Sequence, residues 1–475
     1  MAEKGRPVSS TSRNSDNDKN VMETPANDLV VTKYFMAADI VNAVLKELIV
    51  TIKDGAEVGE ICDLGDRLMS ERIAKVFKKD KDPLKGIAMP TCVSINNCVC
   101  HFSPLRSDRP MIIKDGQMVK IDLGAHIDGF IATTAHTVVV GASPENKIKG
   151  KMANVMLAAY DAMEAAVRML RPGLYKNIEI TDMIDKIANI YQVKPVENML
   201  SHELKKNKID GEKQIIQNPG EKQRSEMTKC NFEKFEVYAV DILMSTGEGK
   251  TRILDSRTTV YKKVDDLVYS LKVKASRMFL SAAMNKYGLM PFTLRSFEDE
   301  KLAKMGVVEC ERHNLMRPYQ VLYEREGEFV AQFKCTVLIM PNGLLKITGF
   351  PLDRNALESD IKIEDQLINV ATIALLKIAA KLEILGDECN QKDQYNSPMN
   401  WEKCSQNITS LLNSSLKPKK AKKKPKSDKK DEDNGSQTND DISGKKEHVH
   451  THSMSVDKKP VLFDGGDAVK VVQEN

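Results

Sequence analysis

The stretch from Val119 to Val140 constrains the fold of this chain more than any other, because its pattern predicts two strands joined at a tight turn. Asp128-Gly129 at its centre is a dipeptide typical of two-residue β-hairpin loops. The flanking residues are largely β-branched, so at least one face of the hairpin is expected to be buried. Asp122 lies in the middle of the first strand. A carboxylate there is paired, hydrogen-bonded or bound to metal, or it is a structural group that caps a turn.

The composition fits a soluble intracellular protein. The 475 residues suffice for one large α/β domain or two smaller ones with tails. Nine cysteines are scattered without a Cys-x-x-Cys pair, which is typical of reduced thiols in a cytosolic or nuclear protein. The chain contains no apolar run of membrane-spanning length and no signal-peptide core, so we expect no membrane insertion.

Hydrophobic periodicity predicts an alternation of helices and strands. The order helix, helix, strands occurs twice, from Val31 to Val140 and from Pro144 to Phe350. Identity between these halves is too low to establish a repeat. The predicted helices span 28–54, 58–77, 144–171 and 180–191, and the predicted strands ahead of the hairpin span 86–90 and 93–100.

The hairpin, with Ile121-Asp122-Leu-Gly in its first strand, resembles the metal-binding hairpin of the methionine aminopeptidases, which have the pita-bread fold. The resemblance implies two further metal ligands in conserved form or nearly so, namely His202 and Asp241, the latter in place of a glutamate. It also implies that Thr133 stands where the family has its second aspartate. Lys334 stands where the family has the glutamate that bridges the two metals.

Two more positions resemble groups that line the substrate pocket of this family. His101, after the run Ala88–Cys100, matches a pocket histidine, although a structural hydrogen-bonding role is equally simple. Asp210 falls where the type II aminopeptidases carry a second, substrate-facing histidine. Both residues are therefore expected to line a pocket.

The substitutions at Thr133 and Lys334 argue against metal-dependent catalysis. A two-metal peptidase activates water and polarises a carbonyl with ions that are held by carboxylates and imidazoles. A neutral hydroxyl and an ammonium group cannot supply that charge. We expect the Lys334 ammonium to occupy the space of the metals and to pair with Asp122 and Asp241, so that no metal or other cofactor is bound. The alternative is an active methionine aminopeptidase with an altered metal site.

Several segments resemble a non-peptidase branch of the same family, the proliferation-associated proteins of the ErbB-receptor-binding type. They include Val30–Tyr34, Asn96–Pro104, Ile209–Lys213 and Tyr323–Phe333. The resemblance implies a growth regulator that associates with RNA and ribosomal particles and acts in ribosome biogenesis, translation and transcription. It also implies a place in the cytoplasm and the nucleus, including the nucleolus. Receptor tails and transcriptional co-repressors are the protein partners that it suggests.

The predicted organisation is an α/β pita-bread domain with pseudo-two-fold halves over residues 28–353. A helical insertion covers about 251–322, with helices at 267–287, 293–304 and 307–315. A helical extension follows over 354–416, and the ends, 1–27 and 417–475, are expected to be disordered. The first part of the insertion is basic, which suits either a charged helix face or a nucleic-acid surface; these residues are Lys262, Lys263, Lys272, Lys274 and Arg277.

A lysine-rich run near the C-terminus predicts contact with phosphate backbones that weakens steeply with salt. The run lacks aromatic residues, so base stacking and strong sequence specificity are not expected. A nuclear or nucleolar address and a solubilising tail are the other interpretations, and the last would suit a protein scaffold without RNA binding. Ile408, Leu411 and Leu412 form a coregulator-like motif ahead of the run. The eight lysines of the run are Lys419, Lys420, Lys422, Lys423, Lys424, Lys426, Lys429 and Lys430.

Overall fold

The core of the protein is a nine-stranded sheet. A computed structural model describes residues 23–77 and 84–361. The main path through the sheet has the order β1-β3-β4-β15-β9-β7-β8, with β16 on β15 and β6 on β9. These strands are β1 (Lys85–Ile95), β3 (Met118–Ile127), β4 (Phe130–Val139), β15 (Val330–Met340), β9 (Val237–Ser245), β7 (Leu200–Leu204), β8 (Gln214–Ile216), β16 (Gly343–Lys346) and β6 (Lys194–Pro195).

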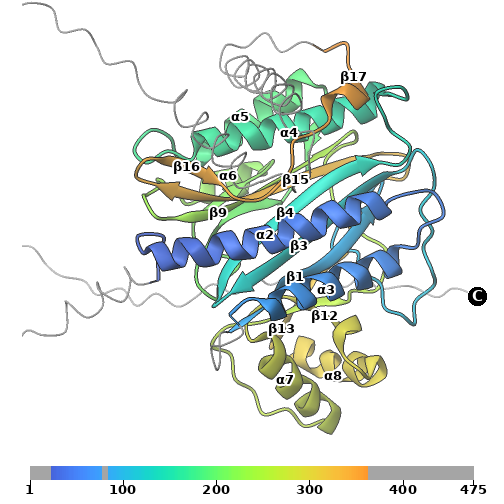
Figure 1. Ribbon diagram of the computed structural model, residues 1–475, viewed down its shortest axis with the longest axis vertical. Coiled ribbons are helices and arrows are strands. Elements are labelled where there is room, and N and C mark those ends of the chain that lie inside the picture. Colours follow the sequence, from blue (N-terminus) through green and yellow to red (C-terminus); the bar gives the residue numbers. More distant parts are fainter. Residues whose placement is uncertain (1–22, 78–83, 362–475) are drawn as a thin grey trace, which may run out of the picture. The chain divides into compact units, whose positions relative to one another are not determined.

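Two helix pairs cover one face of this sheet (Figure 1). Helices α2 (Asp28–Thr51) and α3 (Val58–Lys75) pack on β1, β3 and β4, and helices α4 (Gly150–Met169) and α5 (Asn177–Ile190) pack against the half that contains β9 and β15. The order of two helices followed by strands thus occurs twice, as the sequence predicts. The fold is the predicted α/β pita-bread arrangement of two similar halves.

The organising hairpin forms as predicted. Ile127 pairs with Phe130 across a two-residue loop, in which Asp128 and Gly129 have φ values of 54° and 77°. Left-handed backbone at both positions is the geometry of the tight turn that matches the twist of the strands. Successive side chains alternate between faces, so Ile121 and Leu123 join the core under α2, whereas Asp122 faces away from the helices.

Some predicted boundaries are wrong for local reasons. Residues 86–90 and 93–100 were expected as two strands, but β1 continues through Pro90 by means of bulges, because an edge strand tolerates proline. The helix expected from Pro144 begins only at Gly150. The Ser143 hydroxyl accepts a hydrogen bond from the backbone N–H of Asn146 in a turn, and β5 (Ile148–Lys149) intervenes.

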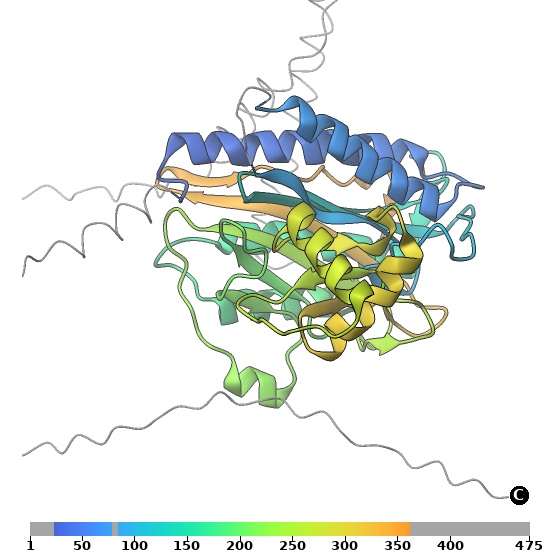
Figure 2. The same cartoon turned by 90° about the horizontal axis from the view of Figure 1, so that it is seen from below.

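The insertion contains more strand than predicted. A three-stranded sheet is formed by β12 (Phe292–Thr293), β11 (Val260–Lys263) and β13 (Met316–Tyr319), and a second one by β10 (Arg252–Ile253), β14 (Leu322–Tyr323) and β2 (Cys98–Cys100). Figure 2 shows the two insertion helices in front of the sheet. These helices are α7 (Lys274–Tyr287) and α8 (Glu300–Arg312), so the helices expected at 293–304 and 307–315 are in fact one, and α7 begins later than residue 267.

Capping groups explain these helix starts. The Asp299 carboxylate accepts a hydrogen bond from the Leu302 N–H at 2.9 Å and so defines the first turn of α8. Glu309 on α8 accepts hydrogen bonds from the backbone N–H groups of Lys272 and Val273, at 2.8 and 3.0 Å. Those two N–H groups are therefore taken by a distant residue, and α7 begins just after them.

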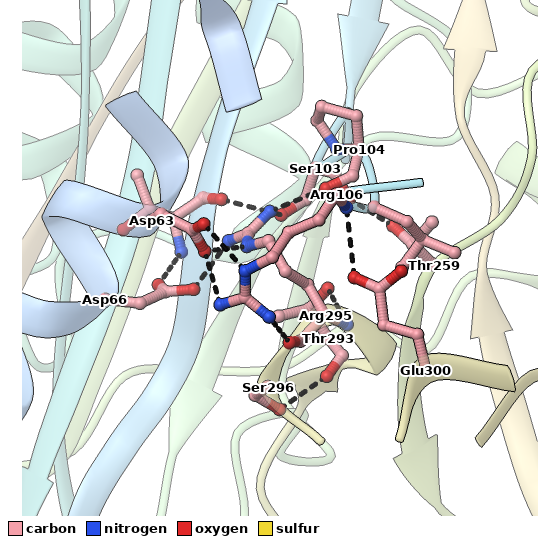
Figure 3. A network of polar contacts seen from close by, with 12 residues as sticks. Asp63, Asp66, Ser103, Pro104, Arg106, Thr259, Thr293, Arg295, Ser296 and Glu300 are labelled. Atoms are coloured by element: carbon pink, nitrogen blue, oxygen red, sulfur yellow. Dashed lines mark hydrogen bonds and ion pairs between the residues drawn. The ribbon is translucent and has the colours of Figure 1, made fainter. Parts of the chain in front are cut away.

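Arg295 ties the insertion to α3 and to the segment Ser103–Pro104 that follows β2 (Figure 3). This side chain is only 1% exposed. Its guanidinium lies 2.7 Å from Asp63 and 2.6 Å from Asp66, both on α3, and donates hydrogen bonds of 2.9 Å to the Ser103 hydroxyl and the Pro104 carbonyl. A single buried cation thus joins three separate stretches of chain.

The described chain ends shortly after the main sheet. Beyond the 3-10 turn η2 (Arg354–Ala356), the strand β17 (Leu357–Glu358) pairs in parallel with β5. The expected helical extension over 354–416 therefore begins with a turn and a short strand. Residues 1–22 of the predicted N-terminal tail, the remainder of that extension, and the predicted C-terminal tail with the lysine run and the motif at Ile408 ahead of it lie outside the described residues. Residues 23–27, which were also expected to be disordered, are described, and the Asn27 side chain accepts a hydrogen bond from the Leu29 N–H at the start of α2. Within the described ranges, none of the helices combines the length and apolar character needed to span a bilayer.

Candidate functional site

The candidate site is a row of side chains that crosses the middle of the sheet. Asp122 on β3 pairs in register with Ala135 on β4, Ala135 with Lys334 on β15, and Lys334 with Asp241 on β9. Residues in register project to the same face. Ala135 stands between Asp122 and Lys334, and its methyl group leaves room for the long lysine side chain to reach across β4.

Lys334 binds both carboxylates. Its Nζ lies 2.7 Å from Asp122 Oδ2 and 3.0 Å from Asp241 Oδ2, and all three side chains are largely buried. Burial alone would lower the pKa of Lys334, but the carboxylates of Asp122 and Asp241 overcome it and raise this pKa above its ordinary value. The lysine is therefore a permanent cation, and both ion pairs expected from the sequence are present.

Gln332 completes this network and was missed in the sequence. Its Nε2 donates to both oxygens of Asp241, at 2.9 and 3.2 Å. Gln332 precedes Lys334 by two residues on the same strand, so the period of two was a signal that could have found it. Asp241 thus accepts hydrogen bonds from a neutral amide and an ammonium, a set of donors that leaves little of its charge uncompensated.

The other two ligand positions of the family lie on the same face. Thr133 pairs with Gly124, two residues beyond Asp122, and His202 pairs with Ala239, two residues before Asp241. The Thr133 hydroxyl and the Oδ1 atom of Asp122 are buried without a hydrogen-bond partner among the described residues. The structure therefore brings all five positions together, although only Asp122, Asp241 and His202 carry groups that bind metals.

The two predicted pocket residues are engaged by the insertion. The ring of His101 packs edge-on against Tyr319 of β13, with ring centroids 5.1 Å apart. Asp210 forms ion pairs with Lys262 of β11 and, at 3.3 Å, with Arg317 of β13. The insertion thus contacts both residues, and it does so through Tyr319 and Lys262, which no local sequence motif marks as part of the site.

Part of the expected basic surface on the insertion does not exist. Lys262 and Lys263 are buried, at 4% and 9% exposure. Lys262 pairs with Asp210, and Lys263 donates to the backbone carbonyls of Val264 and Leu267. Both ammonium groups are therefore used within the protein, whereas Lys272, Lys274 and Arg277 are exposed.

The donor set does not fit a pair of divalent metal ions. Metal ions of this class require several carboxylate oxygens and imidazole nitrogens around each ion. Here an ammonium group lies within 3.0 Å of both available carboxylates. Across residues 23–77 and 84–361, no group of three or more His, Cys, Asp or Glu side chains is arranged to hold a metal ion.

We expect the stability of the protein to depend measurably on pH because of His202, the histidine of the site. Burial, helped by the charge of Lys334, lowers the pKa of His202 to about 4, compared with roughly 6.5 in an unfolded chain. The unfolded state therefore binds the extra proton first, and stability is lost as the pH falls from 6.5 towards 4. Linkage limits this loss to about 1.4 kcal/mol per pH unit for one histidine.

Denaturant unfolding of the wild type and of His202→Gln at pH 7 and pH 5 measures this contribution. We expect the variant to lose less stability than the wild type over this interval. His448→Gln, which changes a histidine near the C-terminus, is the matched control and should keep the wild-type slope. Equal slopes for the wild type and His202→Gln would contradict the assignment of a buried, neutral His202.

Comparison with known proteins agrees with this geometry. The sequence profile of metallopeptidase family M24 matches residues 33–253. Proliferation-associated protein A of Dictyostelium discoideum is 44% identical over 360 residues, which cover 76% of this chain and 92% of that protein. The curved DNA-binding protein of Schizosaccharomyces pombe is 41% identical over 360 residues, covering 75% and 92%. A solved structure of a thermophilic Arx1 matches with a TM-score of 0.67 and 34% identity, covering 72% of this chain and 96% of that one.

The matches cover 92% of the two curated relatives and 96% of the Arx1 chain, so they span nearly the whole length of these proteins. The M24 match covers the first helix pair, the hairpin and the strands that carry His202 and Asp241. The chain therefore belongs to the proliferation-associated protein family, and its residues 33–253 match the model of metallopeptidase family M24.

Proposed function

We propose that this protein is a non-catalytic, RNA- and ribosome-associated growth regulator built on an aminopeptidase fold. The contact of the Lys334 ammonium with both Asp122 and Asp241 is the observation that carries the non-catalytic part. Two unit charges 4 Å apart interact by roughly 4 kcal/mol at an effective dielectric constant near 20. A glutamate-to-lysine exchange replaces an attraction of that order to each divalent ion by a repulsion. The remaining carboxylates are already compensated by the lysine.

Metal content after dialysis against Mn²⁺, Co²⁺ and Zn²⁺ tests this proposal against an active aminopeptidase with an altered site. We expect less than about a tenth of an equivalent of metal for a protein with His448 to His452 deleted, since that tail segment also offers imidazoles. A triple variant, Lys334→Glu with Thr133→Asp and Asp241→Glu, restores five ligands and should bind metal. Lys334→Glu alone should show no peptidase activity.

The altered-site alternative makes the opposite prediction. It requires near-stoichiometric metal in the unmodified protein, lost in both Asp122→Ala and His202→Ala. Clear release of methionine from a peptide by Lys334→Glu alone would also overturn the proposal, because Thr133 and Asp241 are unchanged in that variant. Elemental analysis and a peptidase assay on the same samples decide between the two.

The nucleic-acid part of the proposal rests on charge. The run Lys419–Lys430 provides eight lysines without an aromatic residue, which suits contact with phosphates and not with bases. A relative that is 41% identical carries the name curved DNA-binding protein. We infer from this that phosphate-backbone binding, in the cytoplasm and in the nucleus with its nucleolus, is the property used on RNA and ribosomal particles. Protein partners, such as receptor tails and co-repressors at Ile408, Leu411 and Leu412, would be additional.

RNA affinity at graded salt concentrations measures the contribution of the lysine run. Each phosphate contact on a single strand adds roughly 0.7 to the slope of log K against log salt. Replacing Lys422, Lys423, Lys424 and Lys426 by glutamine should therefore make the slope less negative by about 3, so that RNA affinity depends less on salt. A matched control replaces the exposed insertion residues Lys272, Lys274 and Arg277 by glutamine. Salt-independent binding, or none, would favour a protein scaffold without RNA contact.

A further inference from the structure

The outer edge of β1 is covered along only part of its length. β1 is the edge strand of the main sheet and pairs with β3 on its inner side. From Thr91 onward the outer side is occupied. The Thr91 N–H donates to Asp66 at 2.7 Å, the Thr91 carbonyl accepts from Ser103 at 2.9 Å, and the Val93 N–H donates to the Phe102 carbonyl at 2.8 Å. No described strand pairs with Lys85–Ile87 on that side.

A cleft of about 810 Å³ opens along this part of the edge, which is unpaired among the described residues. One wall is α3, which contributes Leu64 and Ile73, and the other is the end of α7 with Lys286 and Tyr287. Its volume lies within the range of sites that bind small ligands or short peptides. The Arg295 network joins the two walls, because that guanidinium on the insertion side contacts Asp63 and Asp66 of α3 (Figure 3). The cleft is therefore formed in advance of binding.

The part of the cleft next to the strand edge carries positive charge. Five lining side chains are cationic and three are carboxylates, and the carboxylates of Asp63 and Asp66 are taken by Arg295. Lys286 donates to the Ser296 carbonyl at 2.9 Å, and Lys85 donates to the Val76 carbonyl. Neither ammonium contacts a carboxylate in the described part of the chain. Two cations thus flank an unpaired strand edge and an apolar wall.

We propose that Lys85–Ile87 binds an extended acidic peptide segment of a partner protein as an additional β-strand. Unpaired strand edges accept such segments through backbone hydrogen bonds, and pockets for alternate side chains provide the specificity. Carboxylates of the segment face Lys85 and Lys286, and its apolar side chains face Leu64 and Ile73. A nucleotide suits the cleft less well, because it has no extended backbone to pair with Lys85–Ile87 and no apolar side chains to place against Leu64 and Ile73.

Fluorescence anisotropy with the full-length protein tests this proposal. The probe is a fluorescein-labelled heptapeptide of alternating glutamate and valine, compared with the lysine–valine peptide and with a backbone N-methylated form. We expect saturable binding of the first probe only. Lys286→Glu and Lys85→Glu should each weaken it about tenfold, which corresponds to roughly 1.4 kcal/mol. Lys301→Glu, which reverses an exposed charge on α8, is the matched control and should bind as the wild type does.

Three results would overturn the proposal. The first is the absence of saturable binding by the glutamate–valine peptide up to about 1 mM, the weakest affinity of interest here. The second is equal binding by the N-methylated peptide or by Lys286→Glu, since either would exclude pairing at this edge. The third is binding of ATP that responds to Lys286→Glu and displaces the peptide, which would assign the cleft to a nucleotide.

Discussion

Replacement of Lys334 by methionine is expected to lower the free energy of unfolding by about 3–5 kcal/mol at pH 7, the usual cost of removing one partner from a buried ion pair. Methionine keeps the apolar stem of the lysine but removes its charge. The variant leaves Asp122 and Asp241 facing one another in a buried site, where the amide of Gln332 still donates to the Asp241 carboxylate but no ammonium remains between the two. Denaturant unfolding in the presence of EDTA measures the effect without interference from added metal.

The pH dependence of this loss identifies its cause. Burial and the neighbouring charge of Asp241 raise the pKa of Asp122, and Lys334 opposes that rise. Without the lysine the Asp122 carboxylate takes up a proton at higher pH, so the deficit should shrink as the pH falls below neutrality. Adding Asp122→Asn should recover part of the stability. A deficit at pH 7 no larger than that of Lys301→Met, an exposed control, would contradict the buried bridge.

Replacement of Arg295 by methionine is expected to cost about 3 kcal/mol, the lower end of the range for removing one partner from a buried ion pair, because it leaves Asp66, whose side chain is 16% exposed, without its cation, whereas the more exposed Asp63 keeps Arg106. The Arg295 side chain is almost completely buried and contacts Asp63, Asp66, Ser103 and Pro104. These contacts join the insertion to α3, so we also expect faster proteolytic cleavage within residues 251–322 under native conditions. Limited proteolysis with mass spectrometry and denaturant unfolding give the two measurements.

Arg106 provides a matched control for this prediction. It pairs with Asp63 at 3.1 Å and donates to the Arg295 carbonyl at 2.8 Å, but its side chain is 58% exposed. Exposed ion pairs contribute roughly 0–1 kcal/mol, so Arg106→Met should change stability little. Equal losses in Arg295→Met and Arg106→Met would show that burial of the guanidinium is not what stabilises this junction.

The sequence alone was sufficient to predict those features that depend on neighbouring residues, such as turn type and the alternation of side chains along a strand. Asp128-Gly129 predicts the hairpin because few other dipeptides accept two left-handed positions in succession. The alternation of side chains along β3 predicts that Asp122 and the core residues Ile121 and Leu123 face opposite ways. The shared face of Asp122, Lys334 and Asp241 followed from the family resemblance, since three separate strands are involved. Spacing within one strand could not have given it.

Other features depend on contacts between distant segments, which a single sequence does not display. The start of α7 depends on Glu309, which lies on the next helix and takes the N–H groups of Lys272 and Val273. Lys262 appears in the sequence as part of a basic surface, yet Asp210 pairs with it in the interior. The edge of β1 and its cleft arise only when the insertion packs beside α3. Charge and hydrophobic periodicity along the sequence could not have predicted the helix start, the buried lysine or the cleft.

The stabilisation that a covalently attached cation gives to a fold does not depend on the concentration of any free ion. A bound metal ion stabilises a fold by an amount that rises with the free metal concentration relative to the dissociation constant, so starvation or chelation weakens it. The Lys334 ammonium between Asp122 and Asp241 is present at fixed stoichiometry from the moment of synthesis. If the site binds no metal, as we propose, the centre of the sheet needs no loading step and does not depend on the zinc or manganese supply of the cell.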